Sequence, residues 1–424
     1  MKTIALKMLL PLSFSFVSIE SLAASNDHET FVKLEKSAYS LSNTKKTDEL
    51  KLDHSSEVFK ESFVDLFPTL GVGYSKTTIE LDGVETESES KNASLSYNLT
   101  NLAFYPITYQ VNDLNHTISG VEVEQSQKVF KNGFRKNLIS LREAVKKTKN
   151  IETLFALEMK DFQNTEKKFK RGAVSKLGYL RSKNSVDATR NDFENVSKAT
   201  ETKLSNFSAT YKLSKEETES LLRSNLTSNG SVLNHSKELL VKLKTMKVVN
   251  NYSLKESKYE NDLLKLQKKR EIKSYLPDLS LSYRQNLDTE ETTYTVGLTM
   301  SLSTVLKDTS HFKAARKDYL TSTYSYDDKK TSAENSKNDL SDSITVAINN
   351  YKYNLEALKS VKEILDLSKD SYNKGKIESS VLIADWQKYV STSNNVINKK
   401  HLLMKVINDA ELFVGDLSNG SYIF

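Results

Sequence analysis

The most regular pattern along the chain is an alternation of apolar and small polar residues in four short segments, which fall into two pairs. The first pair covers about residues 67–80 and 90–104, and the second covers about 276–286 and 292–303; a polar, acidic stretch separates the members of each pair. A period of two residues predicts β-strands that are apolar on one face. The apolar face contains Leu70, Val72, Tyr74, Leu95, Tyr97, Leu279, Leu281, Tyr283, Val296, Leu298 and Met300, and the other face is mostly Gly, Ser, Thr and Asn.

This pairing of an apolar face with a small polar face is typical of membrane β-barrel strands, which meet lipid on one side and water on the other. A soluble sandwich of two sheets is the alternative, because it also buries one face of each strand. Aromatic residues near the strand ends favour the barrel, since they match an interfacial girdle. These aromatic residues are Phe67, Phe104, Tyr105, Tyr275 and Tyr294. We therefore expect the apolar residues of the strands to face lipid.

Around the strand pairs the pattern becomes helical. Phe134, Leu138, Leu141 and Val145 follow alternating steps of four and three, and a similar seam runs from Ile344 to Leu358. Such heptad-like seams predict long helices packed as coiled coils. The stretch 107–166 alone would form a rod of roughly 90 Å at 1.5 Å per residue. A rod of that length needs a partner helix along its whole surface.

The order of elements occurs twice. Arg171-Gly172 and Lys374-Gly375 each follow a long helical stretch and lie 203 residues apart. A period this long is too great for a solenoid and indicates a duplicated domain. We expect a first repeat at 24–228 and a second at 229–424, each with a helix, two strands and a long helical hairpin. The joint is expected near Ser224 to Ser236, which is the most loop-like run.

Composition agrees with long elements that turn in few places. The 424 residues include only 12 glycines and 4 prolines, where average usage would give roughly 30 and 20. Apart from Pro11, the prolines are Pro68, Pro106 and Pro277, and each is expected where a helix meets a strand. The absence of cysteine excludes disulfides, zinc–thiolate sites and a lipoprotein anchor.

The first 23 residues have the form of a secretory signal peptide. Lys2 and Lys7 precede an apolar stretch of about ten residues, and Ser21-Leu22-Ala23 supplies small residues for cleavage. No later segment approaches 18 apolar residues, so membrane insertion of the exported chain would have to use β-strands. The net charge is only +6, and the lysines are interleaved with glutamates and are not gathered in a patch. This distribution argues against a nucleic-acid partner.

Four strands cannot form a membrane barrel alone, because their edges would be unpaired in lipid. Two copies of the chain would give eight strands, and three copies would give twelve. Because the residues expected to line the lumen are too small to fill it, we expect a homotrimer with an open barrel. The long helices would then continue from the strands as a tube.

The chain resembles the TolC-like outer-membrane efflux protein family over about residues 25 to 417. The resemblance rests on Pro68 and Pro277 in a Leu/Phe-Pro-x-Leu pattern and on Tyr372-Asn373-Lys374-Gly375 followed by Val381-Leu382-Ile383-Ala384. The ending Leu412-Phe413-Val414-Gly415-Asp416-Leu417 is also similar. The duplicated order of elements is more specific than any one of these motifs.

This resemblance implies a trimeric 12-stranded β-barrel in the outer membrane, continuous with a long periplasmic α-helical barrel. Such proteins are passive exit ducts of tripartite efflux pumps or type I secretion systems. The implied partners are a periplasmic adaptor, an inner-membrane transporter and outer-membrane lipid. Adaptor docking and gating are implied at the helical tips, here Arg171, Gly172, Tyr372, Lys374 and Gly375.

The tips also depart from the family. Val381 and Ala384 stand where well-studied relatives carry aspartates of an acidic entrance, and Ile377 stands in place of an arginine. Basic residues are instead numerous there: Lys167, Lys168, Lys170, Arg171, Lys176, Arg181, Lys374 and Lys376. They form either a solvated helix end or a surface that favours anions or an acidic adaptor.

The sequence indicates no enzymatic chemistry. The six histidines are scattered without metal-ligand spacing, and no nucleophile or phosphate-binding motif occurs. We therefore expect no catalytic residues, no cofactor and no metal. A non-conducting scaffold or receptor related to the same family stays open as the alternative to a duct.

Overall fold

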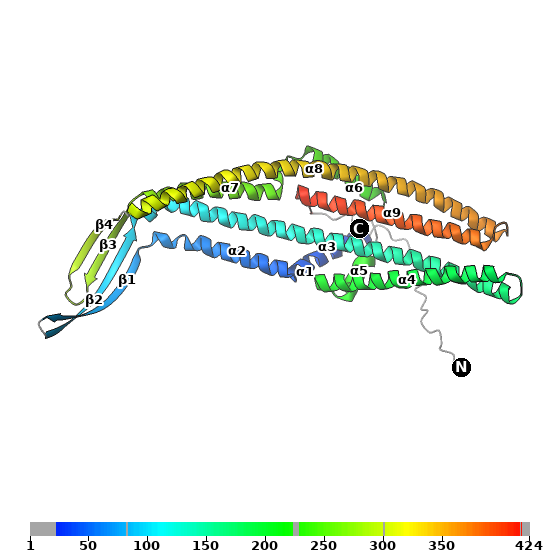
Figure 1. The fold of residues 1–424 in the computed structure, drawn as a ribbon, viewed down its shortest axis with the longest axis horizontal. Helices are drawn as coiled ribbons and strands as arrows, with labels where there is room; N and C mark the ends of the chain where they lie inside the picture. Colours follow the sequence, from blue (N-terminus) through cyan, green and yellow to red (C-terminus); the bar gives the residue numbers. More distant parts are fainter. Residues whose placement is uncertain (1–22, 82–83, 224–228, 300–301, 416, 418–424) are drawn as a thin grey trace.

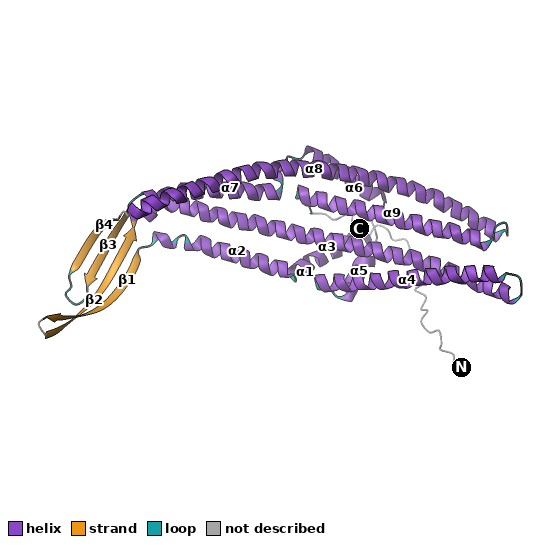
Figure 2. Ribbon diagram, in the orientation of Figure 1, coloured by secondary structure: helices purple, strands orange, loops and turns teal. Residues whose placement is uncertain are grey.

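The computed structural model describes residues 23–81, 84–223, 229–299, 302–415 and 417 (Figure 1). The predicted signal peptide lies outside this part of the chain, apart from Ala23. The molecule is a long rod with a small sheet at one end and two helical hairpins at the other (Figure 2). The expected combination of long helices with a few strands is confirmed.

The sheet is antiparallel and has four strands in the order β1-β2-β3-β4. They are β1 (Thr69–Leu81), β2 (Val84–Asn98), β3 (Asp278–Asn286) and β4 (Thr292–Thr299). The central pair, β2 and β3, joins the two halves of the sequence: Leu95 lies opposite Tyr283. Within the described residues, β1 and β4 each pair with one strand, so each leaves one edge open.

The register brings the apolar residues of all four strands to one face. Leu70 pairs with Leu95, Leu95 with Tyr283, and Tyr283 with Tyr294. This face is open in the single chain: Val72 is 81% exposed and Tyr294 is 76% exposed. On the opposite face side chains must be small, since a Cβ at Gly71 or Gly297 would lie 2.8 Å from a serine hydroxyl of the neighbouring strand.

Two boundaries differ from the sequence-based prediction. The acidic stretch between the first two strands, expected as a loop, is paired as far as Leu81 and Val84. The second strand ends at Asn98, not near 104, because the Asn98 side chain accepts a hydrogen bond from the Asn101 N–H and starts a helix. Pro106 therefore lies inside this helix, and the prediction that it marks a helix–strand junction is wrong.

Pro68 and Pro277 do lie at such junctions. Each directly precedes a strand and follows a short 3₁₀ turn, Val64–Leu66 or Glu271–Tyr275. The Thr100 hydroxyl donates to the Pro277 carbonyl (3.1 Å) and accepts from the Leu279 N–H (2.8 Å). The start of one long helix is thus tied to the start of β3.

Two helices of 72 residues run the length of the rod, α3 (Leu99–Lys170) and α8 (Leu302–Asn373). At 1.5 Å per residue each is about 108 Å long. Each has two shorter helices beside it in succession (Figure 1). These are α2 (Asn43–Glu61) and α4 (Lys176–Tyr211) beside α3, and α7 (Tyr252–Arg270) and α9 (Ser379–Val414) beside α8.

Both near the sheet and near the tips, the described part of the rod is therefore a layer of four helices. Near the sheet the order is α2, α3, α7, α8, and near the tips it is α4, α3, α9, α8 (Figure 1). In both cases α3 packs directly against a helix of the other half of the chain. The outer members near the tips are α4 and α8.

The thickest part lies midway along the rod, where α1 (Ala23–Ser40), α5 (Lys215–Arg223) and α6 (Asn229–Thr245) wrap around the layer. Its core includes Phe31, Phe134, Val232, Ile348 and Met404, all buried. The run Ser224 to Ser236, expected as a loop, is helical from Asn229 onward. We call the three helices α1, α5 and α6 the collar. A 3₁₀ turn, Val248–Asn250, leads from the collar to α7.

Candidate functional site

The two helical tips have the same backbone geometry. Gly172 has φ of 70° and Gly375 has φ of 69°, the left-handed conformation that favours glycine. In the first tip the Gly172 N–H donates to the Phe169 carbonyl and the Ala173 N–H donates to the Lys168 carbonyl, both at 2.9 Å. This pair of hydrogen bonds is a Schellman cap.

The second tip repeats that cap. The Gly375 N–H donates to the Tyr372 carbonyl (2.9 Å) and the Lys376 N–H donates to the Ser371 carbonyl (2.8 Å). The turns found in the sequence 203 residues apart are thus one structure used twice. Arg171 and Tyr372 are exposed at the tips, as is Lys374, whose ammonium donates to Asp370 (2.5 Å).

The two tips carry different charge. Residues 160–183 include eight basic and two acidic residues, whereas the corresponding window 363–386 includes three basic and five acidic ones. All eight basic residues singled out in the sequence are exposed, but six of them belong to the first tip. The basic surface therefore belongs to the first hairpin, and the second hairpin is weakly acidic.

Asp385 lies in the seam of the second hairpin. The Ser368 hydroxyl of α8 donates to Asp385 Oδ2 at 2.5 Å. Next to it, the Trp386 ring packs edge-to-face against Tyr389, and the Lys369 ammonium of α8 lies 4.6 Å from the centre of the Trp386 ring. Both side chains therefore join α8 to α9. Val381 and Ala384, which the sequence comparison sets against aspartates of well-studied relatives, are exposed.

A buried carboxylate connects the two hairpins. Glu158 of α3 is 1% exposed and accepts hydrogen bonds from Ser185 (3.1 Å) and Thr189 (2.8 Å) of α4. It also accepts from the Gln387 amide of α9 (2.8 Å). Two turns away along α3, the Asn150 amide donates to Asn394 (2.8 Å). The sequence does not identify Glu158 as a connecting residue. The one indication of its burial is its position one turn after Leu154 on the buried face of α3.

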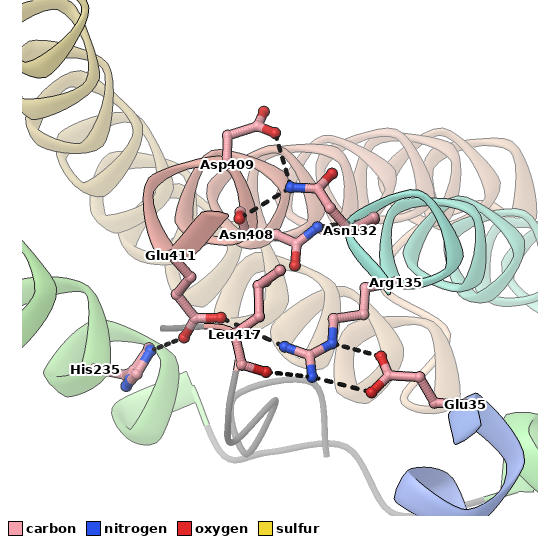
Figure 3. Close-up of polar contacts among 8 residues, drawn as sticks. All are labelled: Glu35, Asn132, Arg135, His235, Asn408, Asp409, Glu411 and Leu417. Carbon is pink, nitrogen blue, oxygen red and sulfur yellow. Dashed lines mark hydrogen bonds and ion pairs between the residues drawn. The ribbon is translucent and has the colours of Figure 1, made fainter. Parts of the chain in front are cut away.

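A second polar cluster ties the collar to the rod (Figure 3). The buried Arg135 guanidinium of α3 donates to both carboxylate oxygens of Glu35 in α1, at 2.7 and 3.2 Å, and to the Leu417 carbonyl at 2.8 Å. Its Nη1 lies 3.5 Å from Glu411 of α9, and His235 of α6 lies 2.8 Å from the same carboxylate. Arg135 thus holds together both ends of the described chain.

Beside this cluster α3 and α9 exchange hydrogen bonds. The Asn132 amide donates to the Asn408 carbonyl (3.1 Å), and the Asn408 amide donates to the Asn132 carbonyl (2.9 Å; Figure 3). Both side chains are buried. This reciprocal pair fixes the longitudinal register of α3 against α9.

Helix α8 has two apolar stripes. One includes Ile344, Ile348 and Tyr351 and is buried inside the rod. The other is exposed and consists of Val346, Tyr353, Ile364 and Leu367, spaced in steps of seven, eleven and three. In the single chain, Tyr353 is 73% exposed. An apolar stripe of this spacing is typical of a helix that packs on another helix.

The predicted lipid-facing residues all lie on the face that β1 to β4 share, with the exception of Met300, which lies outside the described residues. Leu70, Val72, Tyr74, Leu95, Leu281, Val296 and Leu298 are exposed, and Tyr97, Leu279 and Tyr283 are partly exposed. In the described part of the chain, the helices are not apolar over a length that could cross a membrane. Over the same residues, no three metal-ligating side chains gather.

Comparison with known proteins reveals similarity in structure alone. No family model and no curated protein matches the sequence. The outer membrane protein VceC from Vibrio cholerae superposes with a TM-score of 0.73 at 11% identity, over 91% of this chain and 95% of that chain. The CmeC outer membrane channel from Campylobacter jejuni gives 0.73 at 14% identity, over 97% and 91%.

The open state of the MtrE outer membrane channel from Neisseria gonorrhoeae gives a TM-score of 0.73 at 12% identity, covering 95% of this chain and 94% of that chain. The likeness therefore extends over nearly the whole of each molecule, from sheet to tips. At the level of the fold, the resemblance to TolC-like outer-membrane channels that the sequence indicated is confirmed.

Proposed function

We propose that this protein is an outer-membrane export duct that works as a homotrimer. The observation that carries the proposal is a four-stranded sheet with one exposed apolar face and two open edges, continuous with helices of 72 residues. The solved structures that share the fold are described as outer membrane proteins and channels. The helices would then extend into the periplasm.

The sheet supports closure into a barrel of twelve strands from three copies. Open strand edges are not tolerated in lipid, so β1 of one copy must pair with β4 of the next. Three copies of a four-stranded sheet make a barrel wide enough for water, as in membrane barrels that conduct. The Gly, Ser and Thr face would line this lumen and the apolar face would meet lipid.

The helical layer also supports closure of several copies into a ring. Its outer helices near the tips are α4 and α8, and α8 carries the exposed stripe of Val346, Tyr353, Ile364 and Leu367. If α8 of one copy packs on α4 of the next, the stripe is buried and the layer becomes a tube. Such a head-to-tail contact closes into a ring when the rotation fits.

The chain is proposed to be a duplicated domain with repeats at 24–228 and 229–424. In support, each half has the order helix, 3₁₀ turn, two strands, a helix of 72 residues and a helix of 36 residues. The Schellman caps at Gly172 and Gly375 agree as well. The signal peptide at 1–23 would be removed on export.

Transport through such a duct needs no catalysis, so the protein is proposed to be a passive channel and not an enzyme. A tripartite efflux pump or a type I secretion system would supply the energy through an inner-membrane transporter. A periplasmic adaptor would dock at the tips, around Arg171, Gly172, Tyr372, Lys374 and Gly375. The opposite charge of the two tips means that it would meet two different surfaces on each copy.

Fractionation, assembly and conductance test the proposal together. The protein should sediment with the outer membrane, run as a trimer in SDS without heating, and conduct ions in a planar lipid bilayer. Recovery as a soluble monomer in the periplasm would contradict it. A trimer in the outer membrane without conductance would instead favour a non-conducting scaffold, which the exposed Val381 and Ala384 in place of the gate aspartates leave open.

A further inference from the structure

The helices at the two outer edges of the layer near the tips, α4 and α8, carry matching patterns of residues. On α4, Leu180 is 42% exposed, and Lys176 and Lys183 lie four residues before it and three residues after it. These spacings place both lysines beside the leucine on the surface of the helix. Both lysines are exposed as well, and we call the three residues the α4 edge face.

Helix α8 repeats this pattern with the opposite charge. Leu367, a member of the exposed stripe, is 63% exposed. Glu363 and Asp370 lie four residues before it and three residues after it, and both are exposed. We call these three residues the α8 edge face. Two ammonium groups thus accompany a leucine at one edge of the layer, and two carboxylates accompany a leucine at the other edge.

The two edge faces lie at the same distance from their tips. Leu180 is eight residues after Gly172, and Leu367 is eight residues before Gly375. Both tips lie at the same end of the rod (Figure 1). Because α4 leads away from its tip and α8 leads towards its tip, the two helices are antiparallel. The lysines of one face are therefore level with the carboxylates of the other face.

The contact between α3 and α9 inside the chain supports this register. These helices correspond to α8 and α4 of the other half, since α3 and α8 have 72 residues each and α9 and α4 have 36 each. Glu158 lies fourteen residues before Gly172 and accepts a hydrogen bond from Gln387, which lies twelve residues after Gly375. Residues at nearly equal distances from the two tips thus meet across that contact.

Within one chain the two edge faces cannot meet, because α3 and α9 lie between α4 and α8 (Figure 1). Asp370 binds the Lys374 ammonium of its own helix at 2.5 Å. Among the described residues of the single chain, Lys176, Lys183 and Glu363 form no ion pair. Most of the charge of the two faces is therefore available to a second copy.

We propose that the α4 edge face of one copy packs on the α8 edge face of the next copy, and that the charges select this head-to-tail contact. The inference rests on the proposed homotrimer and adds the residues that choose the partner surface. The exposed leucines alone would also allow an antiparallel two-fold pairing of α8 with α8, or of α4 with α4. The first pairing brings carboxylates together and the second brings lysines together, and like charges disfavour both.

Only the head-to-tail contact places opposite charges beside the two leucines, and it is also the contact that can close into a ring. Ion pairs at exposed positions add little net affinity. The apolar surface of the stripe therefore supplies most of the attraction, and the charges determine which surfaces meet.

Cysteine cross-linking tests the contact, because the chain has no cysteine of its own. Full-length protein with both Leu180→Cys and Leu367→Cys is purified in detergent and treated with bismaleimidoethane, a short cross-linker of two thiols. We expect a covalent trimer in heated SDS, since each copy supplies both halves of the contact. The controls are Leu180→Cys alone and Leu367→Cys alone, and both should run as monomers in heated SDS.

Each other outcome overturns the inference in a distinct way. A covalent dimer with Leu367→Cys alone would show that α8 meets α8. A trimer by light scattering in which the double-cysteine protein does not cross-link would remove this contact and leave the proposed function intact. A monomer by light scattering would contradict the proposed homotrimer itself, and the inference with it.

Charge reversal tests the selection. In the double-cysteine protein, Lys183→Glu and Glu363→Lys should each slow formation of the covalent trimer about threefold at low salt, because like charges then meet. The two reversals together should restore the rate, since the pair is rebuilt with its signs exchanged. High salt should reduce the effect of each single reversal, because it screens exposed charges.

The matched control is Lys160→Glu, which makes the same change at almost the same distance from Gly172, but on α3 and away from the edge of the layer. It should leave the rate unchanged. Circular dichroism of every variant checks that the helices have formed. An equal effect of Lys160→Glu, or a double reversal no faster than the single ones, would overturn the selection by Lys183 and Glu363.

Discussion

Single glycines determine where the two long hairpins turn. Gly172 and Gly375 adopt positive φ. Apart from the chain neighbours of each glycine, no side chain of the described residues lies within 4 Å of the position that a Cβ would take there. The constraint at these sites is therefore the backbone conformation and not crowding. Gly120 is the natural contrast, since it lies within α3 and is equally uncrowded.

Alanine at these two kinds of site should act in opposite directions. Gly375→Ala should lower the free energy of unfolding by about 1–2 kcal/mol, because an L-residue is strained in the left-handed region. Gly120→Ala should raise it by about 0.5–1 kcal/mol through better helix propensity. Urea unfolding monitored by circular dichroism measures both changes. Stabilisation by Gly375→Ala would contradict the assigned cap.

The buried His401 should make the protein sensitive to acid. Its pKa falls from 6.5 to about 3 on folding, owing chiefly to burial. Below pH 6.5 the unfolded chain takes up a proton that the folded chain refuses, so stability is complete above that pH and is lost as the pH falls towards 3. The loss should approach about 1.4 kcal/mol per pH unit.

The pH dependence of urea unfolding checks this, with the slope compared among variants. His401→Leu should flatten the slope between pH 6 and pH 4, whereas His54→Leu, at an exposed site on α2, should leave it unchanged. Equal slopes in the parent and in His401→Leu would show that other groups dominate acid unfolding.

Whether the role of a residue could be predicted depends on how far away in the sequence its partners lie. Both tip glycines can be predicted, since a lone glycine between helical patterns implies a local turn. The partners of Arg135 could not be predicted, because they lie 100 and 282 residues away, at Glu35 and Leu417. Glu158 is missed for the same reason: its partner Gln387 is 229 residues distant. Only the packing of separate helices brings these groups together.

At the scale of elements, one buried carboxylate contributes to the packing of α3 against two other helices. Glu158 accepts from α4 and from α9, so its loss should leave the donors on both helices unpaired. Glu158→Ala should lower the free energy of unfolding by about 1–3 kcal/mol, the cost of leaving buried polar groups without partners. Glu152→Ala, on the exposed surface of the same helix, should change it by less than about 0.5 kcal/mol.

A double-mutant cycle between Glu158 and Gln387 isolates the contact across the hairpins. We expect a coupling free energy of about 0.5–3 kcal/mol, because the two side chains share a buried hydrogen bond. Additive effects of the two substitutions would show that the hairpins are held together elsewhere.

The strands offer a test of which face meets lipid. Val296 lies on the apolar face of β4 and Thr295, its neighbour, lies on the small polar face. Val296→Arg should reduce folding into lipid vesicles by about 2–4 kcal/mol if it lies near the middle of the bilayer. Thr295→Arg should fold normally and shift ion selectivity towards anions. The reverse outcome would mean that the small polar face meets lipid and the apolar face lines the lumen.

Strands and helices could be predicted from the sequence more completely than the contacts of single residues. All four strands and both long helices follow from periodicity alone, since each pattern reports one buried face. The boundaries were less predictable where capping competes with alternation. The Asn98 cap ends β2 early, although Phe104 and Tyr105 continue a plausible apolar pattern. The acidic stretch of the first hairpin pairs because its partner strand is covalently adjacent, whatever its polarity.

At the scale of the whole molecule, the exposed stripe of α8 is expected to be where copies meet. Val346, Tyr353, Ile364 and Leu367 leave apolar surface in water in the single chain, and burial of such surface drives association at about 25 cal/mol per Å². Tyr353→Glu places a charge in the middle of the stripe. It should prevent the trimer from forming while leaving the helical content of each chain unchanged.

Lys352→Glu is the matched control, because residue 352 is one place earlier and points about 100° away around the helix. It should assemble normally, although it also introduces a glutamate on α8. Size-exclusion chromatography with light scattering in detergent, with circular dichroism on the same samples, separates loss of assembly from loss of folding. A trimer that survives Tyr353→Glu would move the contact between copies to another face of the rod and would leave only the strand edges to close the duct.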